Sequence, residues 1–157
     1  LHPDNQKLTN GERAELRRAN PKSPVTPTLW KVLMAVGQHE SPPFVSARTW
    51  ERRWAALLVG MSYCAGLHEY NISFGQALAS AGWSEGRFVR LMEADEETLP
   101  FLIRRMSQYL ASKAQPANWD DVRKLIFSVS NPYGEDVRLD ISRDYYRALY
   151  AKDQSES

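Results

Sequence analysis

The sequence lacks the features that mark a membrane-spanning or disulfide-stabilised protein. Cys64 is the only cysteine among 157 residues, so no disulfide can form within the chain. The longest apolar run, residues 55–61, is far shorter than the roughly 20 residues needed to cross a bilayer. No charged-then-apolar secretory leader opens the chain. We therefore expect a cytoplasmic protein that makes no contact with a membrane.

The sequence also has little net charge, only +1, so total charge does not indicate a polyanionic partner. The kind of cation is more informative, because the chain has 14 arginines and only 6 lysines. The flat guanidinium group has a fork of donors that matches phosphate oxygens and can stack on bases. The total charge therefore does not locate a nucleic-acid site, and the local clusters of arginines must be used to find one.

Apolar residues make up 43% of the chain and charged residues 25%, which is typical of a globular protein. Apolar residues recur at spacings of three and four, as in Trp50, Trp54, Leu57, Met61 and Cys64, and this period is helical. Strand alternation is almost absent. The sequence predicts an all-α fold, a compact bundle of about seven to nine short helices.

We expect helices over residues 11–19, 27–36, 46–66, 84–94, 95–110, from 118 onward, and 135–152. Ser46, Asp95 and Asn118 are predicted N-caps because their side chains can accept from free backbone N–H groups. We predict one domain over 1–157 and a disordered tail at 153–157. An arrangement of two helical lobes that meet near 66–83 stays open.

No pattern in the sequence indicates catalysis, a metal or a cofactor. His2, His39 and His68 lie far apart, and no ligand spacing typical of zinc is present. We expect a capping or loop role for His68 and a core position for Cys64. The acidic clusters fall at predicted helix starts or, like Asp140, beside arginines one turn away. We predict no catalytic residue, no metal site, no cofactor and no small-molecule substrate.

The remaining signal is a series of cations outside the apolar stripes, many of them in adjacent pairs. On separate helices that pack together, such pairs can form a basic stripe despite the low net charge. A stripe of this kind would hold phosphates and would not read the base sequence.

Several segments together resemble the CasB family, the small subunit of the type I-E CRISPR complex Cascade. The similarity includes residues 11–18, 73–79, 84–88, 91–95 and 143–146. It covers about residues 8–150, and the order of the segments is more specific than any one of them. Gln76 stands where the family pattern has arginine, and residues 38–45 do not align.

The resemblance implies a non-catalytic helical protein, present as two copies beside other Cascade subunits and the guide RNA (crRNA). It also implies contacts that stabilise the guide–target duplex and the displaced DNA strand of the R-loop. By position it assigns backbone binding to Arg17, Arg18, Arg87, Arg104, Arg105 and Arg143. Periodicity alone adds Arg52, Arg53, Arg123 and Lys124. The alternatives are a helical adaptor without nucleic-acid contacts and a small metal-dependent nuclease.

Overall fold

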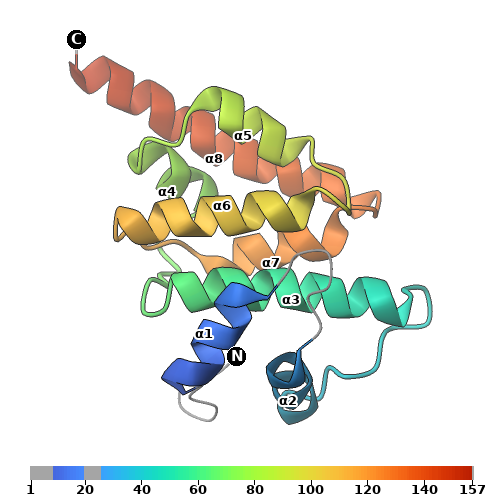
Figure 1. Ribbon diagram of the computed structural model, residues 1–157. Coiled ribbons are helices and arrows are strands. Elements are labelled where there is room, and N and C mark those ends of the chain that lie inside the picture. Colours follow the sequence, from blue (N-terminus) through green and yellow to red (C-terminus); the bar gives the residue numbers. More distant parts are fainter. Residues whose placement is uncertain (1–8, 20–25, 157) are drawn as a thin grey trace.

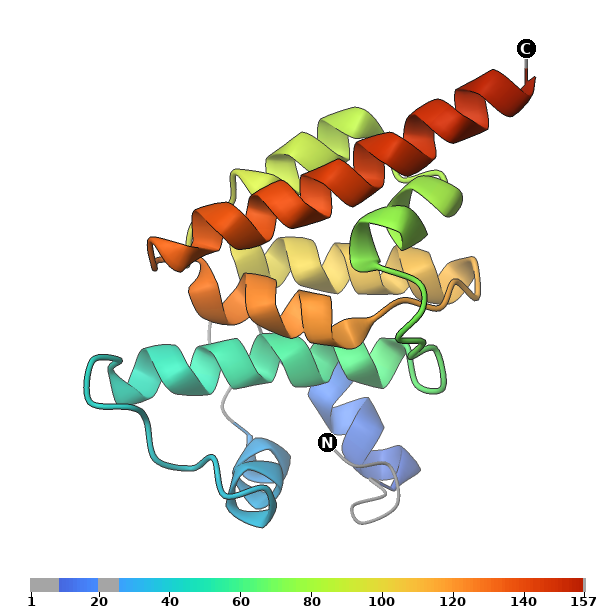
Figure 2. The same cartoon turned by 180° about the vertical axis from the view of Figure 1, so that it is seen from behind.

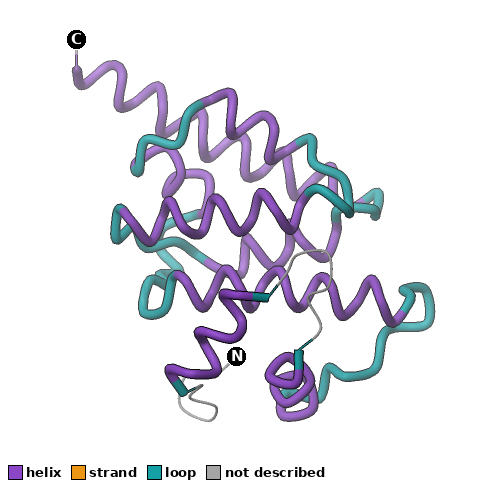
Figure 3. Tube along the Cα trace, in the orientation of Figure 1, coloured by secondary structure: helices purple, strands orange, loops and turns teal. Residues whose placement is uncertain are grey.

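The computed structural model describes residues 9–19 and 26–156, and this part of the chain is helical, as predicted. Its eight helices are α1 (Asn10–Arg18), α2 (Pro27–Ala35), α3 (Ala47–Tyr63), α4 (Phe74–Ser80), α5 (Glu85–Met92), α6 (Leu99–Ser112), α7 (Trp119–Ser128) and α8 (Tyr133–Glu156). Figure 3 shows these helices joined by loops, with no strand drawn among the residues that it colours. An isolated parallel bridge joins His68 to Ala117. No helix in the described ranges is long and apolar enough to span a membrane.

Hydroxyl side chains begin most of the helices. Thr9, Thr26, Ser46, Ser73 and Ser84 are the N-caps of α1 to α5, and each side chain accepts a hydrogen bond from a backbone N–H in the first turn. These bonds satisfy donors that have no partner within the helix. The cap at Ser46 confirms the prediction from the sequence.

Asp95 caps a turn and not a helix, contrary to the prediction. Its Oδ1 accepts from the Thr98 N–H at 2.8 Å, and α6 begins at Leu99, four residues after the predicted start at residue 95. Pro100 lies in the first turn of that helix, where its missing N–H costs no hydrogen bond.

Two apolar clusters lie on opposite sides of α3. The larger cluster includes Phe74, Leu78, Ile103 and Tyr145 from the C-terminal helices. The smaller one joins side chains of α1 and α2 to Ala55 and Leu58 of α3. Figures 1 and 2 show the same division, with α1 and α2 on one side of α3 and α4–α8 on the other. The two clusters therefore meet along α3, N-terminal to residues 66–83.

Helices α4 and α8 approach each other closely at Gly75. A Cβ on Gly75 would meet the backbone oxygen of Ile141 and the backbone nitrogen of Tyr145. The Tyr145 side chain is fully buried beside this contact and stacks on Phe88 of α5 at 3.9 Å between ring centroids. Only a residue without a Cβ fits where α4 and α8 approach in this way.

The last helix is longer than the sequence indicated. α8 runs from residue 133 to residue 156, so residues 153–156 are helical where a disordered tail was predicted, and Ser157 lies outside the described residues. Polar residues such as Gln154 and Ser155 do not end a helix that has already formed. Each residue that extends the helix adds one hydrogen bond, and the unfavourable nucleation step is not repeated.

Candidate nucleic-acid interface

A groove of about 290 Å³ lies between α5 and α6. Arg87 and Arg90 line it from α5, and Arg105 lines it from α6. The remaining lining residues are Trp83, Leu91, Leu102, Gln108 and Tyr109. The lining contains three guanidinium groups and no carboxylate, so the groove offers a positive field to an anion. Figure 1 shows α5 and α6 side by side on the near face of the molecule.

Two aromatic side chains fix the wall of the groove. The Trp83 and Tyr109 rings lie 5.0 Å apart between centroids, and the Tyr109 hydroxyl donates to the Ala81 carbonyl at 2.6 Å. The Arg87 guanidinium carbon lies over the Trp83 ring, 5.2 Å from its centroid. This cation–π contact holds Arg87 at the surface without neutralising its charge.

Of the ten cations predicted to bind backbone, the structure brings only Arg87 and Arg105 together in this groove. Arg90, Trp83 and Tyr109 were not selected from the sequence. Arg90 lies three residues after Arg87 on the same helix, so the one-turn spacing could have identified it. The aromatic residues gave no such signal, because at helical spacing they are indistinguishable from core residues.

Arg53 is buried, although periodicity placed it among the cations outside the apolar stripe and predicted that it binds backbone. Its side chain is 9% exposed, with Nε 3.1 Å from Glu96 Oε1 and Nη1 donating to the Phe127 carbonyl at 3.3 Å. Ser130 Oγ also donates to Glu96 Oε1, at 3.2 Å. The guanidinium therefore ties α3 to the loop before α6 and to the end of α7, and it is not available to a phosphate.

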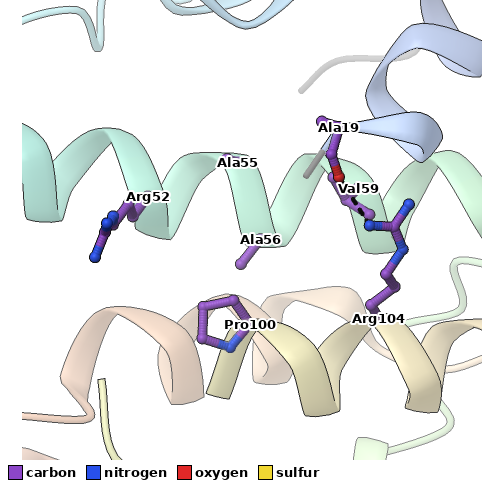
Figure 4. A pocket seen from close by; sticks show the side chains of 7 residues that line it. All are labelled: Ala19, Arg52, Ala55, Ala56, Val59, Pro100 and Arg104. Carbon is purple, nitrogen blue, oxygen red and sulfur yellow. Dashed lines mark hydrogen bonds between the residues drawn. The ribbon is translucent and has the colours of Figure 1, made fainter. Parts of the chain in front are cut away.

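Arg104 ties α6 to the end of α1. Its Nη1 donates to the Ala19 carbonyl at 2.8 Å, the bond drawn in Figure 4. Arg52 and Arg104 flank a small cavity of about 20 Å³, a size that suits a single water molecule. In Figure 4 the side chain of Arg52 points away from that of Arg104. This cavity is not a ligand site.

Arg17 and Arg104 give the region around Tyr63 a positive potential. Burial acts to raise the pKa of Tyr63, but hydrogen bonds with Gln108 and Arg104 and the charges of Arg104 and Arg17 outweigh it and lower that pKa. Arg17 also donates to the Ser62 carbonyl at 3.5 Å. Its neighbour Arg18 is exposed. Gln108 lines the α5–α6 groove as well, so this region continues into it.

Arg123, Lys124 and Arg143 pair with carboxylates on their own helices. Arg123 Nε lies 2.7 Å and Lys124 Nζ 3.5 Å from Asp120, and hydrogen bonding to Arg123 holds the pKa of Asp120 below its ordinary value. Arg143 lies 3.2 Å from Asp140, as predicted. Their helices, α7 and α8, lie behind α6 and α5 in Figure 1 and in front of them in Figure 2. The ten predicted cations therefore do not form one stripe.

Histidine, cysteine and acidic side chains form no cluster of three that could hold a metal ion within residues 9–19 and 26–156. His68 lies in a loop, as one of the two predicted roles has it, and its Nδ1 accepts from the Trp119 N–H at 3.2 Å at the start of α7. The sequence did not predict this partner.

Cys64 should be unreactive in the folded protein. The residue is buried, and its Sγ donates to the Ser107 carbonyl at 3.2 Å. Burial raises the pKa of the thiol to about 12, so the nucleophilic thiolate is scarce at neutral pH. We expect Ellman's reagent to label one thiol per chain in denaturant and almost none in native buffer at pH 8. Rapid labelling of the native protein would contradict the burial of Cys64.

The described chain is an all-α protein with an arginine-lined groove on one face. The family model of CRISPR-associated protein Cse2 matches residues 12–146, so the chain belongs to this family. None of the curated proteins compared with the chain matches it.

Solved structures share the fold at low sequence identity. CasB of M. ruber is 22% identical with a TM-score of 0.71, covering 97% of this chain and 92% of that one. A chain in the crystal structure of E. coli Cascade bound to a PAM-containing dsDNA target is 18% identical with a TM-score of 0.70, covering 92% and 91%. CasB from Thermobifida fusca is 16% identical with a TM-score of 0.67, covering 86% and 83%.

Proposed function

We propose that this chain is a non-catalytic subunit of a Cascade-type CRISPR complex and holds nucleic-acid backbone through surface arginines. The observation that carries the proposal is the α5–α6 groove, where three guanidinium groups converge and no carboxylate lines the wall. Membership of the Cse2 family, and the shared fold with a chain of DNA-bound E. coli Cascade, supply the context.

The proposed binding set differs from the predicted one at two positions. Arg53 leaves it because its guanidinium is buried against Glu96, and Arg90 enters it because it lines the groove. The set then comprises Arg17, Arg18, Arg52, Arg87, Arg90, Arg104, Arg105, Arg123, Lys124 and Arg143. The cations paired with Asp120 and Asp140 must exchange a surface ion pair for a phosphate, which costs little because exposed pairs contribute about 0–1 kcal/mol.

The role we propose is to stabilise the R-loop formed by the guide RNA and the two DNA strands. Strand exchange in such complexes is nearly balanced, because the RNA–DNA duplex formed is about as stable as the DNA duplex that it replaces. A few phosphate contacts are then enough to favour the open form. We propose the other Cascade subunits and a second copy of this chain as its protein partners.

Binding of the chain to single-stranded DNA should weaken steeply as salt rises. Each phosphate contact to a single strand contributes a slope of about −0.7 in log K against log salt, so three contacts predict about a twentyfold loss between roughly 50 and 200 mM salt. Fluorescence anisotropy with labelled oligonucleotides over a salt series measures this slope. Binding that does not change with salt would contradict the proposal and favour an adaptor without nucleic-acid contacts.

The assembled complex provides the second part of this test. We would co-purify the chain with the other Cascade subunits and guide RNA, and compare R-loop half-life with and without the chain. The expected result is a shorter half-life without it. An unchanged half-life would exclude the proposed role, and DNA cleavage by the purified chain with Mg²⁺ would favour the nuclease alternative.

A further inference from the structure

We propose that the α5–α6 groove is a seat for one unpaired nucleotide of a single strand. Its arginines would bind the phosphate, and the Trp83–Arg87 wall would support the base. This inference rests on the proposed function, because it takes nucleic acid to be the partner. It is more specific, since it names one site on the protein, a single strand as the partner and one nucleotide of that strand as the bound unit.

The charges of the groove have no partner in the described part of the chain. The guanidinium groups of Arg90 and Arg105 make no ion pair and no hydrogen bond there, and that of Arg87 contacts only the uncharged Trp83 ring. By contrast, Arg123 and Arg143 each face a carboxylate. Converging like charges repel one another and raise the local concentration of anions. An anion in the groove relieves that repulsion.

The wall of the groove also has a donor without an acceptor. Trp83 is 7% exposed, and its buried Nε1 has no hydrogen-bond partner among the described residues. Trp54 and Trp119 have the same kind of unpaired Nε1 away from the groove, so the Trp83 indole is a probe of the wall and not itself a donor to the ligand. The Tyr109 hydroxyl is already used, since it donates to the Ala81 carbonyl. The donors that the groove offers to phosphate oxygens are therefore those of Arg87, Arg90 and Arg105, whose charged N–H groups make strong hydrogen bonds to such oxygens.

Size and shape favour a nucleotide of a single strand over a duplex. A volume of about 290 Å³ lies at the small end of ligand pockets, which begin near 300 Å³. A volume of this size suits one nucleotide. Arg87 lies over Trp83 and is itself exposed, so a base can stack on its guanidinium group. Such stacking needs a base that is not already stacked in a helix.

Indole NMR on the full chain tests the seat directly. In ¹⁵N-labelled protein, with dTMP as the probe, we expect the Trp83 indole resonance to shift. Trp54 and Trp119 are matched internal controls, because their Nε1 atoms are also buried without a partner but do not line the groove. A stationary Trp83 resonance, or equal shifts of all three, would overturn the proposal. The Trp83→Phe variant is needed only to assign the resonance.

Charge variants give a second, independent readout. Arg90→Gln with Arg105→Gln should reduce the salt slope for oligo-dT by about 1.4, because each lost contact removes about 0.7. The matched control is Arg147→Gln with Lys152→Gln, which removes two exposed charges from α8 and should leave the slope unchanged. Equal slopes for the groove variant and wild type overturn the seat, but they leave the proposed function standing if wild-type binding still depends on salt.

Competition identifies what the groove recognises. We expect dTMP to displace oligo-dT at about a tenfold lower concentration than inorganic phosphate does, because a stacked base adds to the phosphate contact. Equal potency would reduce the site to a general anion site and overturn the nucleotide assignment. Preference for a blunt duplex over oligo-dT, or for a phosphoserine peptide over dTMP, would overturn it in favour of another partner.

Discussion

Replacing Gly75 with alanine should lower the free energy of unfolding by about 3 kcal/mol, the upper part of the range for overpacked sites. The added methyl group would meet the backbone of α8 at Ile141 and Tyr145. Backbone atoms cannot rotate away as a flexible side chain can, so α4 and α8 must separate. Tyr145 and Phe88, which are stacked beside this contact, would then lose part of their packing.

Thermal unfolding followed by circular dichroism measures the effect of Gly75→Ala. A loss of about 3 kcal/mol corresponds to a melting temperature about 6–12 °C lower for a chain of this size. Gly86→Ala is the matched control. Gly86 is also helical, and no heavy atom lies within 4 Å of the position of its added Cβ. That variant should be as stable as wild type or slightly more stable, because alanine favours helix. Equal melting temperatures for both variants would contradict the close approach of α4 and α8.

Glu96→Ala should cost about 3 kcal/mol, because it leaves the charge of Arg53 buried without a counter-ion. Arg53 would keep only the Phe127 carbonyl as an acceptor. Glu96 itself is 32% exposed, so water reaches one side of the pair, and we place the cost at the lower end of the range for buried pairs. Chemical denaturation measures it, and Glu97→Ala is the control, since Glu97 is adjacent in sequence and exposed.

A double variant separates the charge effect from loss of packing. Combining Glu96→Ala with Arg53→Met removes both charges, so most of the lost stability should return. No recovery would mean that the cost of Glu96→Ala comes from packing and not from an unpaired charge. Arg53→Met alone should leave the oligo-dT affinity of the folded protein unchanged. A lower affinity there would restore Arg53 to the binding set.

The helical fold could be predicted from the sequence because its signals are local. The apolar stripe of α3 and the caps at Ser46 and Asn118 are defined by residues within one or two turns. The errors fell at helix ends, where the evidence is weakest. Asp95 can cap a turn as well as a helix, and the polar end of α8 contains nothing that breaks a helix. The position of α3 between two apolar clusters depends on contacts between distant residues, which periodicity does not reveal.

The binding site was less predictable than the fold. Periodicity indicates which side of a helix faces the core, but it does not indicate which residues of other segments lie opposite a given side chain. Arg52 and Arg53 are neighbours on α3, yet Arg53 meets Glu96 from 43 residues away. Arg104 and Arg105 separate in the same way, one toward Ala19 and the other into the groove. Adjacent arginines therefore meet different surroundings, because successive side chains on a helix point about 100° apart.

The position of α3 between two apolar clusters determines how the chain can be divided. Ala55 and Leu58 complete the smaller cluster, whereas Ala56 and Leu57 belong to the larger one. A fragment that ends before α3 would leave Leu29 and Val32 exposed to water, and a fragment that begins with α3 would expose Ala55 and Leu58. Affinity tags, split reporters and truncation boundaries therefore belong outside residues 10–63, and the N-terminal helices should be kept in any shortened form of the protein.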